Sequence, residues 1–151
     1  DESMKLRMKE IGMTLHQVLT LAAIVEKESG AENERPVIAS VYLNRLKIGM
    51  RLQADPTVIY GMKNYQGKIR KSDLLSPHAY NTYTMSGLPP GPIAAVSIMA
   101  IKAVLWPEAS SYLYFVSKND GTHEFCPNIK CHNQAVKKWQ IDYFRNTAQT
   151  R

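Results

Sequence analysis

The sequence predicts an α+β fold in which helices dominate and one β-hairpin comes late in the chain. Two segments of helical length, residues 15–29 and about 34–48, contain no glycine and end at Gly30 and Gly49. Aromatic and β-branched residues gather much later, at residues 112–117. At 151 residues, with 44% hydrophobic and 21% charged residues, the chain has the size and composition of one ordinary domain. We therefore expect residues 1–151 to form a single domain.

The two long segments are expected to form a helical hairpin. Thr14 and Gln17 have the spacing of a capping box, which marks the start of the first helix. Pro36 falls in the first turn of the second helix, where its missing N–H group costs no hydrogen bond. Because the connection is short, the two helices should pack side by side.

The stretch between residues 51 and 92 is irregular and rich in Pro and Gly, and it predicts only short helices near residues 56–61 and 71–75. A long irregular stretch in a compact domain usually carries function, so we interpret it as the wall of a binding site. Residues 87–92, Gly-Leu-Pro-Pro-Gly-Pro, predict a stiff loop that suits either a cleft edge or a rigid connector.

The last third of the chain predicts a helix, a hairpin and another helix. Residues 96–105 are expected to form a helix that ends before Pro107. Residues 112–117 and 122–125 flank an Asn-Asp-Gly turn and are expected to pair as antiparallel strands. Residues 132–144 predict the final helix, because apolar residues are spaced among charged ones.

The charge and the two ends of the sequence limit the classes of partner. A net charge of +6 attracts polyanions, but the basic residues are scattered and accompany no nucleic-acid-binding motif, so we expect no nucleic acid. No apolar run reaches the length of a membrane span, and no signal pattern opens the chain. The abrupt charged start is interpreted as a segment cut from a longer, membrane-anchored protein, with the anchor outside this chain.

Cys126 and Cys131 are the only cysteines, so no disulfide framework holds the fold together. A single bridge between them is open to a protein outside the cytoplasm. Together with His123 and His132 they also offer zinc-ligand chemistry, but at a spacing unlike the common zinc sites. We expect no metal and no cofactor, and a zinc-stabilised interaction domain is the weaker alternative.

The most informative segment is residues 21–30, an apolar helix that ends in two carboxylates, Glu26 and Glu28. At about 100° per residue, Glu28 shares a face with Leu21 and Val25, whereas Glu26 lies away from both. A carboxyl held against apolar side chains has a raised pKa and can supply the proton that glycosidic cleavage needs. The alternative is that both glutamates are solvated residues of a final helical turn.

Asp55 is the obvious second carboxylate. In Asp-Pro-Thr at residues 55–57 it also has the position of a helix cap, in which the carboxylate holds backbone N–H groups ahead of Pro56. We favour the cap for this carboxylate, while the residue can still shape a cleft.

Amides, hydroxyls and aromatic rings that suit a ligand with polar edges and an apolar face, such as a sugar ring, gather between residues 53 and 83. Asn81 offers an amide among them. For any one of these residues, the alternative is packing in the core or stabilising a turn. The candidates for sugar binding are Gln53, Asp55, Thr57, Tyr60, Tyr80, Asn81, Thr82 and Tyr83.

Six ordered stretches between residues 21 and 133 form a pattern far more specific than any short motif. They are IVEKES (24–29), ASVYLNRL (39–46), LQADPTVIYG (52–61), YNTY (80–83), GLPPGPI (87–93), and GTHEF with HN (121–125 and 132–133). Together they resemble the endolytic murein transglycosylases, also called the YceG-like family.

The resemblance implies a mainly helical, lysozyme-like catalytic core with Glu28 as its acid. Glu28 would protonate the β-1,4 oxygen between N-acetylmuramic acid and N-acetylglucosamine, and then accept the proton of the muramic 6-hydroxyl as it closes on C1. The implied product is a 1,6-anhydro end formed without water, so one carboxyl serves as acid and then as base. We expect Ser29 and His123 to line the cleft beside Glu28.

The same resemblance implies a lyase whose substrate is the peptidoglycan glycan strand. It places the domain on the extracytoplasmic face of a bacterial cell membrane, in a protein associated with wall-synthesis and division proteins. Two other readings stay open: a lysozyme-like muramidase that uses Asp55 as base, and a non-catalytic glycan-binding module of the division machinery.

The sequence departs from the family at Ala95-Val96, where an Asn-Pro pair is common. A sugar contact by that asparagine is therefore not expected in this chain.

Overall fold

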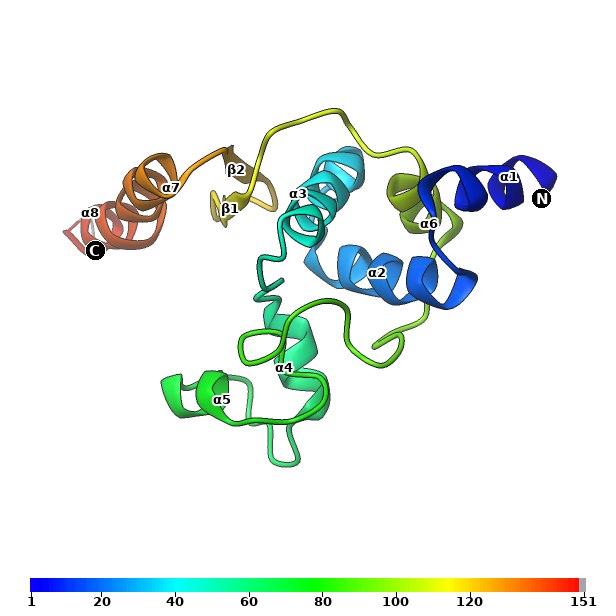
Figure 1. Cartoon of the computed structure of the whole chain (residues 1–151). Coiled ribbons are helices and arrows are strands. Elements are labelled where there is room, and N and C mark those ends of the chain that lie inside the picture. The colour runs from blue at the N-terminus through cyan, green and yellow to red at the C-terminus, as the bar shows by residue number, and fades with distance from the viewer. Residues whose placement is uncertain (150–151) are drawn as a thin grey trace.

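The computed structural model describes residues 1–149, and within them it confirms the α+β class, with helices and a two-stranded antiparallel sheet (Figure 1). A 3-10 turn, η1 (Glu32–Glu34), leads into α3, and a π-helical segment, η2 (Lys137–Asp142), joins α7 to α8. The hairpin consists of β1 (Tyr114–Ser117) and β2 (His123–Cys126). The helices are α1 (Glu2–Ile11), α2 (Leu15–Glu28), α3 (Arg35–Lys47), α4 (Asp55–Gly61), α5 (Lys71–Leu75), α6 (Ile98–Leu105), α7 (Ile129–Val136) and α8 (Tyr143–Gln149).

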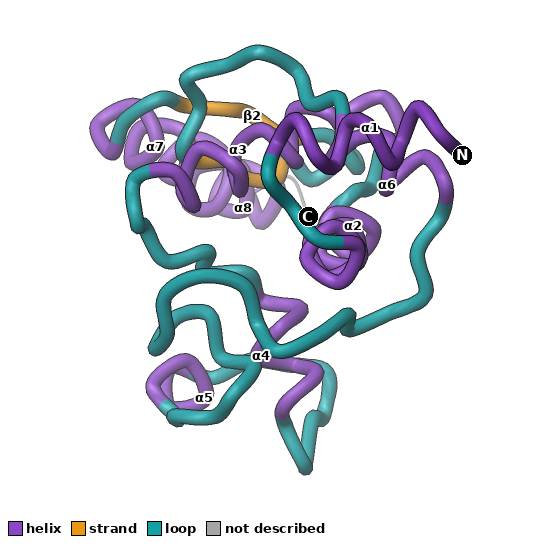
Figure 2. The backbone as a smooth tube through the Cα atoms, turned by 45° about the vertical axis from the view of Figure 1, so that its right-hand side comes forward, coloured by secondary structure: helices purple, strands orange, loops and turns teal. Residues whose placement is uncertain are grey.

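Helix α2 lies at the centre of the fold. It begins with the predicted capping box between Thr14 and Gln17, and its residues 18 and 20–25 are buried. A helix that is apolar on every side must be covered on every side. Helices α3 and α6 pack against α2, while α4 approaches its C-terminal half from the opposite side (Figures 1 and 2). Glu26 and Glu28, at the end of α2, are therefore carried by the most enclosed helix of the described chain.

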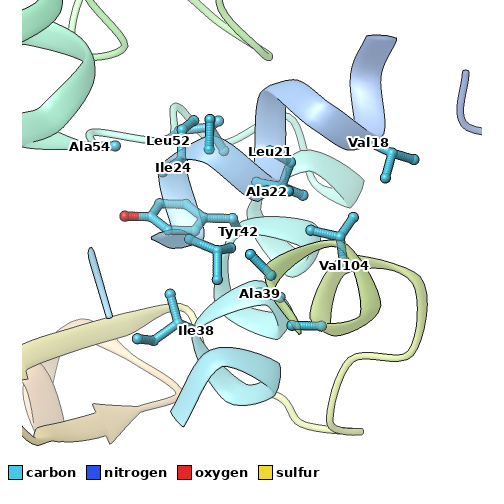
Figure 3. Packing of buried hydrophobic residues seen from close by; sticks show 14 of the residues in the cluster. Val18, Leu21, Ala22, Ile24, Ile38, Ala39, Tyr42, Leu52, Ala54 and Val104 are labelled. Carbon is cyan, nitrogen blue, oxygen red and sulfur yellow. The ribbon is translucent and has the colours of Figure 1, made fainter. Parts of the chain in front are cut away.

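The hydrophobic core joins side chains of α2, α3 and α6 (Figure 3). Leu21 and Ile24 of α2 meet Ile38 of α3 and Val104 of α6, all fully buried. Leu52 and Ala54, from the segment before α4, close the core beside the end of α2. Burying side chains of this size stabilises the fold by roughly 1.5–3 kcal/mol each.

Helix α1 was not predicted, since the charged residues at the start of the chain hid its apolar spacing. Met4, Met8 and Ile11 recur every three or four residues and pack on the core. The carboxylate of Asp1 caps the helix by accepting from the Met4 N–H, and the Arg7 side chain donates to the Leu105 carbonyl at 2.7 Å. This first segment is thus part of the folded unit.

The other boundaries differ from the predictions by a few residues. Helix α6 begins at Ile98 rather than residue 96, because Ser97 caps it by accepting from the Ala100 N–H. The last helical segment begins at Ile129, where Asn128 caps α7, and it continues through η2 and α8 to Gln149. The predicted range of 132–144 was therefore correct in kind and too short at both ends.

The hairpin pairs Tyr114 with Cys126 and Ser117 with His123. Its turn contains Asn119 at φ 67° and Gly121 at φ 89°, a left-handed geometry that the predicted Asn-Asp-Gly sequence favours. Cys126 and Cys131 form a disulfide that joins the end of β2 to α7. The hairpin is thus fixed to the C-terminal helices on one side.

Candidate active site

The two glutamates at the end of α2 lie in different environments. The Glu26 carboxylate accepts from the Ser97 hydroxyl at 2.7 Å and the Ser97 N–H at 3.2 Å, and it pairs with Arg35 at 3.6 Å. The Ser97 hydroxyl bond is the largest influence on this group, and the pKa of Glu26 is lowered. Glu26 therefore stays ionised and ties α2 to the start of α6.

Glu28 instead lies in a pocket of about 160 Å³ on the other face of α2. The residue keeps partial access to solvent through this pocket. Burial is the main cause that raises the pKa of Glu28 to about 7, the negative charge of Asp55 raises it further, and the Arg45 guanidinium opposes both. Near neutral pH the carboxyl can hold a proton and can also release it. The pocket is lined by Glu28, Tyr42, Arg45, Leu52, Gln53, Asp55, Tyr83 and Phe115.

Helix α3 supplies two pocket residues that we did not predict, Tyr42 and Arg45. Tyr42 is almost fully buried (2% exposed), and burial, followed by the nearby Glu28 charge, raises the pKa of its hydroxyl well above the usual value. Tyr42 is thus a neutral group beside the acid. A signal for both residues was present in the sequence, because a tyrosine and an arginine three residues apart lie on one helical face.

Arg45 joins three walls of the pocket. Its guanidinium donates to the carbonyls of Leu113 at 2.7 Å and Leu52 at 2.6 Å, and it lies over the Tyr114 ring at 5.3 Å from the centroid. A planar guanidinium can satisfy several acceptors at fixed angles, which a lysine cannot. Arg45 therefore holds the segment before α4 and the segment before β1 against α3.

Asp55 and Tyr83 form a pair at the mouth of the pocket. The Tyr83 hydroxyl donates to Asp55 Oδ1 at 2.5 Å, and burial together with this bond raises the pKa of Tyr83. The favoured prediction that the Asp55 carboxylate caps a helix was wrong: α4 begins at Asp55 itself, and no side-chain cap bond is present. The carboxylate faces the pocket because Tyr83, 28 residues later, provides its donor.

Gln53 lies beside this pair with an unusual backbone. Its φ of 50° is in the left-handed region, which costs a non-glycine residue roughly 1–2 kcal/mol. The conformation is held by Thr82, whose carbonyl accepts from the Gln53 N–H at 3.2 Å and whose hydroxyl accepts from the Ala54 N–H at 2.9 Å. Gln53 is exposed and lines the pocket from this fixed backbone.

Three predicted sugar-binding residues are internal supports instead. Thr57 and Thr82 are fully buried and bonded hydroxyl to hydroxyl at 2.8 Å. Asn81 is also fully buried; its amide donates to the carbonyls of Ser76 and Leu74 and its oxygen accepts from the Tyr83 N–H. With every polar group engaged inside the protein, these side chains have nothing to offer a sugar. Their role is to hold Gln53 and Tyr83 in place.

The remaining predicted residues do not line the pocket. The Ser29 hydroxyl donates to the Val25 carbonyl at 2.6 Å and ends α2. Tyr60 is half exposed and packs on Tyr80, with 4.7 Å between ring centroids. His123 contacts Glu34 through its Nδ1 at 2.9 Å and meets the Phe115 ring edge to face. His123 is thus placed behind Phe115, the hairpin residue that does line the pocket.

The hairpin is seated against the α2–α3 connection by a close backbone approach. A Cβ added to Gly30 would lie 2.5 Å from the Gly121 carbonyl oxygen. Glu34 adds a second anchor, because it accepts from both the His123 ring and the His123 N–H. The hairpin that carries Phe115 to the pocket is thus held at two places.

We expect Gly30→Ala to destabilise the protein by about 1–3 kcal/mol, because the methyl group collides with backbone that cannot rotate away. Gly91→Ala is the matched control, since the added Cβ would meet only His16 and Tyr80 atoms at 3.5 Å or more. Urea unfolding of both variants measures the difference. Equal stability of the two would contradict this view of the hairpin seat.

The stiff loop at residues 87–92 does not border the Glu28 pocket. Gly87, Leu88 and Pro89 instead line a larger hollow of about 970 Å³, between α1 and the face of α3 that carries Leu43 and Lys47. Its only ionisable lining residues in the described chain are Arg7, Lys47 and Glu108. The smaller pocket, which contains Glu28, is therefore the candidate active site.

The four residues considered for zinc do not come together as ligands. Cys126 and Cys131 are bonded to each other, and His123 is directed to Glu34. Within residues 1–149, no cluster of His, Cys, Asp and Glu side chains is arranged to hold a metal ion. No helix in this described range has the length and apolar character needed to cross a membrane.

Comparison with known sequences identifies close relatives. The family model described as the YceG-like family matches residues 1–138. The endolytic murein transglycosylase of Bacillus subtilis (strain 168) is 40% identical over 138 residues, which cover 91% of this chain and 38% of that protein. The endolytic murein transglycosylase of Streptococcus pneumoniae serotype 2 is 32% identical over 139 residues, covering 85% of this chain and 24% of that protein. The chain thus spans well under half the length of these relatives.

A crystal structure of a YceG-like protein from Listeria monocytogenes has a similar fold. It superposes with a TM-score of 0.81 at 40% sequence identity, over 88% of this chain and 44% of that one.

Proposed function

Because this chain belongs to the YceG-like family, we propose that it is the catalytic domain of an endolytic peptidoglycan lytic transglycosylase. The observation that carries the proposal is Glu28, a carboxyl with a pKa of about 7 in a pocket with hydroxyl and amide groups at its wall. The names of the relatives support a murein substrate. The action on the MurNAc-β-1,4-GlcNAc bond and the residue roles below belong to the proposal.

In the first step Glu28 acts as general acid. Its carboxyl proton passes to the glycosidic oxygen, the bond from C1 of the muramic acid to that oxygen breaks, and the electron pair leaves with the oxygen as a hydroxyl of N-acetylglucosamine. A carboxylic acid whose pKa lies near the working pH is suited to this step, because much of it is protonated and the proton is still labile.

In the second step the same group acts as general base. The muramic 6-hydroxyl oxygen bonds to C1, and its proton passes to the Glu28 carboxylate, which restores the acid. No water is consumed, and the product is a 1,6-anhydro end. Since the proton lost in the first step is regained in the second, one carboxyl completes the cycle, unlike the two-carboxylate glycosidases.

We assign substrate contact to two polar side chains at the pocket wall, Gln53 and Tyr83. Gln53 is exposed, and Tyr83 remains a neutral hydroxyl. Tyr60 offers an exposed ring outside the pocket, which suits the apolar face of a more distant sugar.

A lysozyme-like muramidase is the second candidate, because Asp55 lies in the same pocket and could activate water. A non-catalytic glycan-binding module is the third reading. Incubation of purified murein with the domain separates binding from catalysis: we expect release of soluble fragments. Retention of the protein on murein with no fragment released would support the binding module and contradict the proposal.

The rate of murein cleavage is expected to fall as the pH rises through about 7. The general acid must be protonated, so the active fraction decreases about tenfold per pH unit above the pKa of Glu28. Rates of fragment release between pH 5 and 9 measure this decrease. A rate that stays constant up to pH 9 would contradict the role of Glu28 as acid.

The proposal places the domain on the extracytoplasmic face of the membrane, where peptidoglycan lies. The Cys126–Cys131 disulfide supports this location, because such bonds persist in oxidising compartments. Membrane attachment through a segment outside this chain, and association with wall-synthesis and division proteins, are parts of the same proposal.

A further inference from the structure

Asp55 is the one other acid among the described residues that line the Glu28 pocket. It makes no cap bond to α4, and its Oδ1 is held by the Tyr83 hydroxyl at 2.5 Å. Tyr83 is in turn fixed by Asn81, whose buried side chain accepts from the Tyr83 N–H at 2.9 Å. The Asp55 carboxylate therefore has a defined place beside Glu28, at the exposed side of the pocket.

We propose that Asp55 is a positioning residue whose fixed negative charge keeps the proton on Glu28 before cleavage and returns it afterwards. The inference rests on the proposed function of Glu28 as acid and base. In this view Asp55 neither donates a proton nor forms a bond to the sugar. It acts on the substrate only through Glu28.

The physical reason is the repulsion between two anions in one pocket. While Glu28 is protonated, the pocket contains the single negative charge of Asp55. Once Glu28 has given its proton to the leaving oxygen, two carboxylates face each other, and this state is costly. Uptake of the proton from the 6-hydroxyl relieves the repulsion. The same charge thus favours the starting state and drives the closing step.

The other groups that face Glu28 do not supply this effect. Arg45 of α3 is a cation and favours loss of the proton. Tyr42 of α3 and Tyr83 have raised pKa values, for which burial is the first cause, so both stay neutral. The hairpin contributes only Phe115 to the lining. On α2 itself, Glu26 is engaged by Ser97 on the opposite face.

The direct test is an NMR titration of the Glu28 carboxyl in protein labelled with ¹³C at the glutamate side chains. Glu28→Gln identifies the resonance by its loss. We expect the titration midpoint near pH 7 in the wild type and about 1 pH unit lower in Asp55→Asn. Asp142→Asn, on η2, is the control because it removes the same charge outside the pocket, and its midpoint should equal that of the wild type. An unchanged midpoint in Asp55→Asn would overturn the proposal.

Murein cleavage provides the second readout. In Asp55→Asn the fall in rate at high pH should begin about 1 pH unit lower, which lowers the rate at pH 8 about tenfold and leaves the rate at pH 5 nearly unchanged. A folded Asp55→Asn protein that is inactive at every pH would overturn the proposal, because Asp55 would then be a reacting group. If the wild type itself releases no fragments, the proposed function fails, while the NMR titration still decides the effect of Asp55 on Glu28.

Discussion

Replacement of Glu28 by glutamine is expected to lower the rate of murein cleavage by about 10²–10⁴-fold. The amide has nearly the shape of the carboxyl and can occupy the same pocket, but it can neither give a proton to the glycosidic oxygen nor take one from the 6-hydroxyl. Fragment release from purified murein measures the loss. Glu26→Gln is the comparison two residues away on the same helix, and it removes an ion pair with Arg35 rather than a proton donor.

The inactive Glu28→Gln protein should be folded, and above pH 7 it should be more stable than the wild type. The pKa of Glu28 is raised from 4.5 to about 7, so the contribution of the protonated carboxyl to the free energy of unfolding is complete below pH 4.5 and is lost as the pH rises through 7. The full loss corresponds to about 3 kcal/mol. Glutamine carries no charge at any pH, so the variant does not lose this stability. Urea unfolding at pH 5 and pH 8 measures both proteins. A variant less stable than the wild type at pH 8 would make its inactivity a folding defect.

Replacement of Arg45 by methionine is expected to lower the free energy of unfolding by about 2–4 kcal/mol. Methionine fills much of the space, but the carbonyls of Leu52 and Leu113 lose their donor in a site closed to water. The segment before α4 and the segment before β1 then lose their common link, so the pocket should widen and cleavage should fall as well. Urea denaturation at pH 7 measures the stability.

Arg145→Met is the matched control for Arg45→Met. Arg145 lies exposed on α8, so the same substitution should change stability by less than about 0.5 kcal/mol. If Arg45→Met costs no more than this control, the guanidinium is not the link between the pocket walls.

The position of Glu28 could be predicted from the sequence because it depends on a local property. Two steps of about 100° along the α-helix place Glu28 and Glu26 on different faces, whatever surrounds the helix. The structure gives each glutamate a different partner set, Ser97 with Arg35 for Glu26 and the pocket for Glu28. The hairpin turn was predictable for a similar reason, since Asn and Gly tolerate the positive φ that the turn needs.

The pocket wall that faces Glu28 could not be predicted, because residue type does not say which way a side chain faces. Asn81 and Thr82 have sugar-binding chemistry, yet both are fully buried and make their hydrogen bonds to other groups of the protein. Asp55 has the sequence of a cap, but the tyrosine that redirects it lies 28 residues away. Such assignments depend on long-range packing. On α3 the available signal was the spacing of Tyr42 and Arg45, which places both on one helical face.

The central claim, that one carboxyl cleaves the strand without water, is tested most directly by the mass of the new glycan ends. Purified murein is digested by the wild-type domain in H₂¹⁸O and the fragments are analysed by mass spectrometry, with Glu28→Gln run in parallel. We predict 1,6-anhydro muramic ends, one water lighter than reducing ends and free of ¹⁸O, which are missing from the variant digest. Reducing ends that have gained a labelled water would contradict the account and identify a hydrolase.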